Sequence, residues 1–541
     1  MRGRSRGLRA LWGIAFGAMV LLPVACGSPS SASNNGGSGT NANATVTIGL
    51  PEEPDTLDPQ RSNAAATGDI LDVAGNALVA QNPQGKIVPD LAGSWTTSSD
   101  GLHWAFNLIH GASFQNGDPV DAQTVVASFQ RAMNPATQPG AIAALLAPVA
   151  DVKATGQYQV TFDLKQQYSP FLTNLASGNA SIVDAAVAAK EGSQFGRAPV
   201  LTGPYRITSW QAGTSITLVR NSAYHWGPSY QHQGPGYIKS LVFRIITDDS
   251  TMAAAIQSGE VQSTYSLSTA KVKQFQGSSQ FHLFHYLRKG VGLYLEFNVN
   301  KAPFNDVKVR QALNYAIDKQ AIIKVALQGM GVPACGPLPS SIPGYWSGIC
   351  NYGPKYDPAK AKQLLGEAGW TPGPGGVLQK DGQPFQFTVS TMATPSSWND
   401  SAQLLQQQLK AIGINMQIQN YEFATLLARA EAGQDAAHLM GYTYTDPDIL
   451  YLLFDSQAGS EGINLSHVSD PKLDQMLQQY REQQSLQQQN QTYEEIQKYV
   501  VDQGIQVPLW VNQNYGVTAS NLQDVKLNFQ GLPIWQDVKV S

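Results

Sequence analysis

The stretch LYLEFNVNKAPFNDVKVRQALNYAIDKQAIIKVALQG, residues 293–329, decides the fold. Apolar and polar side chains alternate at its start, which predicts a strand with one buried face formed by Leu293, Leu295, Phe297 and Val299. Pro303 has no amide hydrogen to donate, so the strand should end before it. Asp306 and Asp318 are good N-cap residues ahead of apolar helical stripes, and Gly329 should end the second helix. The stretch therefore predicts strand, loop, helix and helix.

The length of the chain predicts more than one folded body. Its 541 residues exceed what one hydrophobic core usually serves, so two or more lobes are expected. Apolar residues make up 42% and charged residues 14%, which is typical of a globular protein and excludes a highly charged disordered one. The Asp100-Gly101 pair between two strand-like runs predicts a hairpin. Strands alternate with helices in residues 385–418, which indicates an α/β protein with mixed sheets.

The N-terminus has the pattern of an export signal. Four arginines precede an apolar run at residues 10–25, and this run is too short for a spanning helix. The sequence LPVACGS at residues 22–28 resembles a bacterial lipobox, so Cys26 should become a lipidated N-terminus after residues 1–25 are removed. The alternative is a plain signal peptide that leaves a free cysteine. Residues 26–43 are rich in Ser, Gly and Asn and should form a flexible tether.

Charge and cysteine content restrict the partners. Loss of the four signal arginines would leave 31 basic against 39 acidic residues, a formal charge of −8, which argues against nucleic acid. Cys335 and Cys350 are the only other cysteines. In an oxidising compartment they would close a Pro- and Gly-rich loop, for roughly 3 kcal/mol of stability. The alternative for this pair is a two-thiol metal site, although no histidine is near.

Catalytic motifs are missing from the sequence. It contains no G-x-S-x-G, H-E-x-x-H, G-x-x-x-x-G-K-[ST] or G-x-G-x-x-G segment. The closest histidine pair, His282 and His285, has no acidic or thiol companion nearby. We therefore expect no enzyme, no cofactor and no metal site.

Three blocks of sequence resemble one known family. The strand followed by APFND (302–306) and VRQALNYAID (309–318) is similar to the most recognisable segment of the family 5 extracytoplasmic solute-binding proteins. These are the oligopeptide and dipeptide receptors of ABC importers. Residues 92–131 and the segment PKYDPAKAKQLLGEAGW (354–370) resemble the same family.

The resemblance implies a two-lobed periplasmic-binding-protein-like fold of class II, of the large type, with mixed sheets and an extra subdomain in the first lobe. Its implied parts are lobe Ia at 44–80, 198–290 and 508–541, lobe Ib at 81–197, and lobe II at 291–507. The opening stretch would then act as a hinge between the lobes.

The segment MGYTYTDPD, residues 440–448, is the predicted recognition loop. It follows a predicted strand and precedes a helix, where open α/β sheets hold ligands. It resembles the family's Gly-Trp-x-x-Asp…Asp-Pro loop, whose first Asp holds the amino terminus of a peptide, but it is about two residues shorter. The nearest alignment puts Thr445 or Asp446 at that position. Asp446 is the better prediction because a buried ammonium needs a paired carboxylate; Asp448 is its competitor, and a helix cap or turn is its alternative role.

Other residues of the predicted site are aromatic or contribute through the backbone. Tyr442, Tyr444 and Phe423 could offer flat surfaces to ligand side chains or to a porphyrin-like ligand, or they could pack in the core. By resemblance, the segment after Leu-Asp-Pro and a later asparagine also face the ligand. The remaining predicted contacts are Gly441, Thr443, Asn63, Ala65 and Asn464.

The sequence thus predicts a monomeric lipoprotein receptor on the outer face of a bacterial membrane. It would close two lobes over a short peptide and deliver it to the permease and ATPase of an importer. Two alternatives remain: the same fold binding haem, a nickel chelate or another small solute, and a lipoprotein that senses peptides without transporting them.

Overall fold

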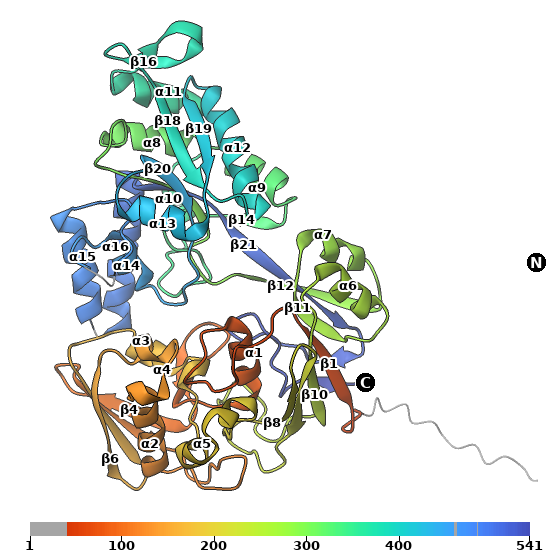
Figure 1. Ribbon diagram of the computed structural model, residues 1–541. Coiled ribbons are helices and arrows are strands. Elements are labelled where there is room, and N and C mark those ends of the chain that lie inside the picture. The colour runs from red at the N-terminus through yellow and green to blue at the C-terminus, as the bar shows by residue number, and fades with distance from the viewer. Residues whose placement is uncertain (1–39, 459–461, 484) are drawn as a thin grey trace, which may run out of the picture. The chain divides into compact units, whose positions relative to one another are not determined.

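The computed structural model describes residues 40–458, 462–483 and 485–541 (Figure 1). The chain separates into two units, residues 1–39 and residues 40–541. The predicted export signal, Cys26 and most of the predicted tether lie outside the described residues. Among the described residues, no helix combines the length and the apolar content needed to cross a bilayer.

A long mixed sheet runs through the second unit in the order β19-β18-β20-β13-β21-β11-β1-β10-β9-β8, and β12 and β14 also pair with β21. We call its two parts the first and the second half-sheet. The first half-sheet contains β1 (Thr45–Leu50), β8 (Tyr205–Gln211), β9 (Ser215–Arg220), β10 (Ser240–Ile245), β11 (Ser263–Leu267) and β12 (Phe281–Leu287). The second contains β13 (Leu293–Phe297), β14 (Gly331–Pro333), β18 (Gln386–Thr391), β19 (Asn415–Asn420) and β20 (Ala437–Met440).

Strand β21 (Gln506–Ala519) belongs to both half-sheets, and Figure 1 shows it crossing between them. Its first residues pair with β13 and β14, and its last residues pair with β11 and β12. A lobe boundary at residue 508 would therefore cut through a continuous strand. The chain crosses a second time through residues 288–292, between β12 and β13.

Smaller sheets complete the fold. A four-stranded antiparallel sheet is formed by β4 (Ala92–Thr97), β5 (His103–Leu108), β7 (Gln159–Leu164) and β6 (Val149–Gly156). Short ribbons are β2 (Val79–Gln81) with β3 (Ile87–Pro89), β15 (Thr371–Pro372) with β16 (Leu378–Lys380) and β17 (Gln383–Pro384), and β22 (Leu522–Gln523) with β23 (Lys539–Val540). The four-stranded sheet has its own apolar core, built around Phe106, Phe129 and Phe162.

Helices pack on these sheets. Before β13 the chain forms α1 (Ala65–Ala74), α2 (Ala122–Met133), α3 (Ile142–Leu145), α4 (Phe171–Leu175), α5 (Ala185–Glu191), α6 (Asp249–Gln257) and α7 (Thr269–Val272). After β13 it forms α8 (Val307–Ala316), α9 (Lys319–Ala326), α10 (Ile349–Tyr352), α11 (Pro358–Glu367), α12 (Ser396–Lys410), α13 (Phe423–Glu431), α14 (Ile449–Phe454), α15 (Pro471–Glu482) and α16 (Leu486–Gln503).

The predicted helix caps of the opening stretch are confirmed. The side chain of Asp306 accepts the backbone N–H of Lys308 at 2.9 Å, and α8 begins at the next residue. The side chain of Asp318 accepts the N–H of Ala321 at 3.0 Å ahead of α9. Such a cap contributes about 1 kcal/mol. Helix α9 ends at Ala326, three residues earlier than predicted.

The prediction that β13 has one buried face is wrong, because all five of its residues are buried. The strand lies between β20 and β21, and both of its faces are covered. Leu293, Leu295 and Phe297 pack in a core with α8, α9, α11 and α12, whereas Tyr294 packs on the opposite face with α14, α15 and α16. Glu296 is completely buried on that second face.

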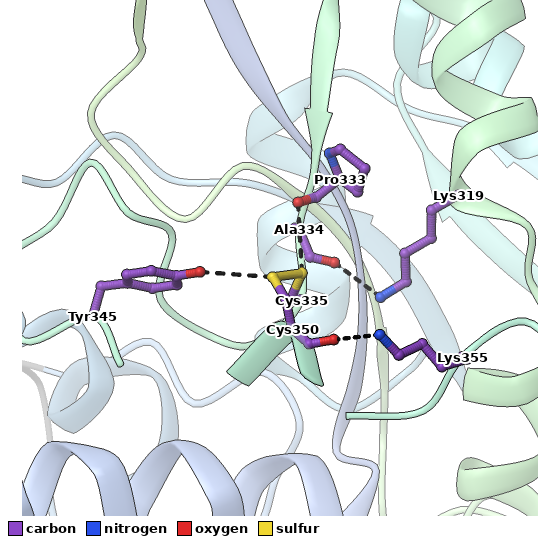
Figure 2. Close-up of a disulfide and its surroundings, with 7 residues drawn as sticks. All are labelled: Lys319, Pro333, Ala334, Cys335, Tyr345, Cys350 and Lys355. Carbon is purple, nitrogen blue, oxygen red and sulfur yellow. Dashed lines mark hydrogen bonds between the residues drawn. A yellow bond between two sulfur atoms is a disulfide. The ribbon is translucent and has the colours of Figure 1, made fainter. Parts of the chain in front are cut away.

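A disulfide joins Cys335 and Cys350, the pair that the sequence predicts, across a separation of 15 residues (Figure 2). Two lysines hold the neighbouring backbone: Lys319 Nζ donates to the carbonyl of Ala334, and Lys355 Nζ donates to that of Cys350, both at 2.9 Å. Burial lowers the pKa of Lys319 to about 8.

Changing both Cys335 and Cys350 to serine should lower the free energy of unfolding by about 3 kcal/mol, because the unfolded chain regains the freedom of the closed loop. Urea unfolding followed by circular dichroism measures this loss. The matched control is the unchanged protein in dithiothreitol, which should show the same loss. A variant that unfolds at the same urea concentration as the unchanged protein would contradict the prediction.

Candidate ligand-binding site

The carboxyl ends of three parallel strands meet at one edge of the second half-sheet. Strands β18, β19 and β20 run parallel, β13 runs antiparallel beside β20, and β21 runs antiparallel to β13. The segments that leave this edge are therefore the loop after β20, residues 441–448, and the crossover at residues 288–292. Ligands of open α/β sheets bind at such an edge. Two cavities lie beside the loop.

The first cavity, of about 200 Å³, lies at this edge, and we call it the hinge cavity. It is lined by the crossover, by residues 441–443, by residues 510–512 of β21, and by the aromatic side chains of Trp398 and Phe423. Four predicted contacts therefore come together here: Gly441, Tyr442, Thr443 and Phe423. The hydroxyl of Tyr442 is buried without a hydrogen-bond partner. Burial raises the pKa of Tyr442, and the nearby carboxylate of Glu296 adds to the effect.

Glycines allow the crossover to approach the loop. Gly290 has a φ of 123°, and a Cβ atom there would lie 2.0 Å from the carbonyl oxygen of Tyr442. Gly292 has a φ of 76°, and its Cβ would lie 2.4 Å from the carbonyl oxygen of Trp510. Side chains at either position would push the crossover away from the loop or from β21.

The second cavity, of about 560 Å³, contains Asp446 and Pro447, and we call it the Asp446 cavity. The four-stranded sheet and its neighbouring helix α4 supply its other wall, including Trp104, Tyr168 and Thr173. Asp446 is 8% exposed, and its carboxylate accepts the backbone N–H of Asp448 at 2.9 Å and a hydrogen bond from the side chain of Thr173. Asp446 thus caps a turn and also lines a cavity.

Burial raises the pKa of the Asp446 carboxyl to about 7, and the neighbouring Asp448 carboxylate adds to the effect. A cation that enters the cavity would stabilise the ionised form of this carboxyl, because it would replace the stabilisation that the carboxylate loses when water is excluded. A cation in this cavity would therefore be favoured over a neutral group.

Asp448 has a different environment. It is 2% exposed and pairs with Arg481 at 3.1 Å between Oδ1 and Nε, and it accepts a hydrogen bond from the hydroxyl of Tyr480. The guanidinium of Arg481 also lies 3.8 Å from the centre of the Tyr451 ring. Asp448 lines neither cavity, and its charge is already balanced inside the protein. The structure therefore gives no support to Asp448 as a competitor of Asp446.

The other predicted contacts are not brought to either cavity. The backbone N–H of Asn63 donates to the carboxylate of Asp55 at 2.9 Å, and Ala65 begins α1. The side chain of Asn464 donates to the carbonyl of Val468 at 2.8 Å and stabilises a turn elsewhere. Tyr444 packs against the core of α14 to α16, and Thr445 is half-buried beside it. Of the predicted contacts, those that line the two cavities are therefore Gly441, Tyr442, Thr443, Asp446 and Phe423.

Several residues of the two cavities could not be predicted from the recognition loop. In the hinge cavity these are Arg288, Lys289, Trp398 and Trp510, and in the Asp446 cavity they are Trp104, Tyr168, Arg481 and Tyr493. Arg288 and Lys289 precede the Gly290-Val291-Gly292 segment, and two cations beside paired glycines are the one sequence signal that could have indicated them. Among the described residues, no group of three or more His, Cys, Asp and Glu side chains could hold a metal ion.

Two half-sheets joined by one strand and one glycine-containing crossover, with cavities at the junction, define a two-lobed binding protein. The model of the bacterial extracellular solute-binding proteins, family 5 (middle region), matches residues 86–462, and the chain belongs to this family. It is a solute-binding protein of the class that serves ABC importers, and the family is one of substrate-binding proteins rather than enzymes.

Known proteins extend this similarity over most of the chain. The glutathione-binding protein GsiB of Pectobacterium atrosepticum is 32% identical over 390 residues, which are 71% of this chain and 69% of GsiB. The structure of HbpA2 from Haemophilus parasuis superposes with a TM-score of 0.82 at 25% identity and covers 92% of this chain and 100% of HbpA2. The oligopeptide-binding protein AppA of Bacillus subtilis, solved with a nonapeptide, has a TM-score of 0.68 at 24% identity, covers 93% of this chain and 100% of AppA, and shares the fold.

Proposed function

We propose that this protein is the receptor of an ABC importer that captures short peptides and delivers them to the permease. The observation that carries the proposal is the recognition loop itself, which has a buried carboxylate at Asp446 and a cation, Arg288, bound to Thr443 at its other end. A peptide with free ends carries an ammonium and a carboxylate, and these match the two charges. Glutathione, the ligand in the name of the GsiB relatives, is itself a modified tripeptide.

The proposed size of the ligand follows from the length of the loop between Thr443 and Asp446. Thr443 and Asp446 are three residues apart, so their Cα atoms are separated by at most about 11 Å. An extended peptide spans about 3.3 to 3.6 Å per residue, so about three residues fill this interval. We therefore propose ligands of two to four residues, bound with the amino end at Asp446.

Capture would involve closure of the two lobes. In the part of the chain that the structure describes, only β21 and the crossover at residues 288–292 join the half-sheets, so small backbone rotations there can move one lobe against the other. A ligand that contacts both walls of the Asp446 cavity favours the closed state by its differential affinity. Backbone hydrogen bonds and bridging waters would then bind peptides of many sequences.

We further propose that Cys26 carries a lipid and that residues 26–43 connect the folded body to the outer face of the membrane. The family is extracellular, and the lipobox-like LPVACGS precedes the Gly- and Ser-rich segment. We propose the same lobes as the sequence predicts: lobe Ia at 44–80, 198–290 and 508–541, lobe Ib at 81–197, and lobe II at 291–507. Strand β21 is shared by lobe Ia and lobe II. The rival functions are capture of haem, a nickel chelate or another solute, and peptide sensing without transport.

Isothermal titration of the purified protein with alanine peptides of two to six residues tests the proposal. The di- to tetrapeptides should bind more tightly than the hexapeptide. N-acetylation, which removes the ammonium, should weaken binding by roughly 2 to 5 kcal/mol, or 30-fold and more. Absence of binding by every peptide, with saturable binding of haem or a nickel chelate, would replace the proposal with its rival.

A further inference from the structure

We propose that the hinge cavity is an anion site, in which Arg288 and Lys289 bind the carboxylate of the solute and the aromatic walls hold an apolar group next to it. The assignment deepens the proposed function and rests on it for the biological ligand. It names a solute class, which is a carboxylate with an adjacent apolar or aromatic substituent. In a peptide, this class corresponds to an apolar C-terminal residue.

The charge of the cavity supports an anionic ligand. Arg288 and Lys289 both line it, and none of the residues that line it is acidic. Within the part of the chain that the structure describes, neither cation forms an ion pair with a carboxylate. Arg131, by contrast, pairs with Asp58 at 2.6 Å. Two adjacent unpaired cations in a cavity favour a ligand that brings a negative charge.

The contacts of the two cations leave donors available. The Arg288 guanidinium donates to the hydroxyl of Thr443 at 3.1 Å, which is a neutral acceptor. Lys289 Nζ donates to the carbonyl of Ser341 at 3.0 Å and lies 3.3 Å from the centre of the Phe529 ring. A guanidinium has five N–H donors and an ammonium has three, so both groups can still donate to a carboxylate. Burial lowers the pKa of Lys289 to about 8, which an anion nearby would reverse.

The walls of the cavity favour an apolar group beside the anion. Trp398, Phe423 and Trp510 line it together with Met392. Phe423 is 46% exposed, which makes it one of the few exposed large apolar side chains among the described residues. An aromatic group that packs against such rings contributes more to binding than its buried area alone would.

The position of the site relates binding to closure. Arg288 and Lys289 lie on the crossover between the two half-sheets, and the backbone N–H of Arg288 donates to the carbonyl of Asn512 on β21 at 2.8 Å. An anion bound by these cations and by residues 441–443 would link the recognition loop to the crossover and, through the crossover, to β21. It would therefore restrict the segments that must rotate when the lobes move.

The test uses the full chain, purified in mild detergent, and two probes: N-acetyl-L-phenylalanine and its C-terminal amide. Neither probe has an amine, so Asp446 has no cation to bind and the result does not depend on the peptide proposal. Ligand-observed NMR titration should show saturable binding of the acid. The amide, which lacks the charge, should bind about tenfold more weakly or worse.

Arg288→Gln and Lys289→Met should each weaken binding of the acid about tenfold without changing binding of the amide. The matched control is Arg206→Gln, because Arg206 is exposed on β8 of the first half-sheet and lines neither cavity. This variant should bind the acid as the unchanged protein does. Thermal unfolding of each variant shows whether a loss of affinity for the acid comes from misfolding.

Equal affinity for acid and amide, or no saturable binding of the acid up to its solubility limit, would overturn the anion site. The failure of each proposal is distinguishable. If free peptides bind but C-terminal amidation has no effect, only the anion site is wrong. If no peptide binds, but the acid probe still binds the unchanged protein more tightly than it binds the Arg288→Gln variant, only the peptide proposal is wrong.

Discussion

Replacing His438 with leucine should lower the free energy of unfolding by about 3 to 5 kcal/mol, since it removes the hydrogen-bond partner of a completely buried carboxyl group. His438 on β20 and Glu296 on β13 lie opposite each other in the sheet, with 2.9 Å between Nε2 and Oε2. They are 1% and 0% exposed. Without the imidazole, the Glu296 carboxyl group would remain inside the protein with no group to balance it. Its other oxygen, Oε1, already has no hydrogen-bond partner.

The double variant Glu296→Leu/His438→Leu should be far more stable than either single variant. A buried ion pair replaced by apolar residues of similar volume is often neutral or stabilising by 1 to about 4 kcal/mol, because two desolvation costs disappear together. The four proteins form a double-mutant cycle, measured by urea unfolding. Additive effects of the two changes would show that Glu296 and His438 do not stabilise each other.

The exposed pair of Lys308 and Glu367 is the matched control for this cycle. Their Nζ and Oε2 atoms are 3.2 Å apart, and the two side chains are 45% and 41% exposed. Because water solvates both charges, Glu367→Gln should change the free energy of unfolding by less than about 1 kcal/mol. A loss at His438 as small as this would indicate that water reaches the buried pair.

The burial of Glu296 is a feature of the fold that could not be predicted from the sequence. Alternation along residues 293–299 identifies a strand, because side-chain direction in a strand is local. It cannot tell that α14 to α16 cover the face that carries Tyr294 and Glu296, since this depends on chain segments more than 150 residues away. Caps at Asp306 and Asp318 and the hairpin at Asp100-Gly101 were predictable because their hydrogen bonds span a few residues.

The same limit applies to the site. The recognition loop could be predicted, because a loop that follows a parallel strand leaves the binding edge of the sheet whatever its neighbours are. Its wall partners Trp104 and Tyr168 come from the four-stranded sheet and from the segment before α4, and no local pattern relates them to Asp446. Asn464 resembled a ligand-facing position, yet its amide is used within its own turn.

Peptide affinity should rise with pH from about pH 5.5 to about pH 7.5, since Asp446 must be ionised to pair with a peptide ammonium. Burial raises the pKa of this carboxyl to about 7, so in the ligand-free protein it is mostly protonated below neutrality. Each pH unit below that value should weaken binding up to about tenfold, while the peptide amine, with a pKa near 8, stays charged over this range. Isothermal titration of trialanine in buffers of equal ionic strength measures the profile.

The stability of the ligand-free protein should change in the opposite direction. The folded pKa of Asp446 lies above its ordinary value of 3.8, so the folded state holds its proton more tightly than the unfolded state does. This contribution to stability is complete below the ordinary pKa and is lost as the pH rises towards 7. The ligand thus gains affinity over the same pH range in which the empty site loses stability.

The variant Asp446→Asn tests whether this carboxyl group causes the pH dependence, because it removes only this titrating group. The variant should bind trialanine weakly at all pH values and show no rise between pH 5.5 and 7.5. Asp381→Asn is the matched control, because Asp381 is exposed in the turn between β16 and β17 and should leave the profile unchanged. A rise of the same size in Asp446→Asn would assign the titration to another group. A flat profile in the unchanged protein would mean that the ammonium is bound elsewhere, because a carboxyl buried as deeply as Asp446 cannot neutralise a cation across this range without losing its proton first.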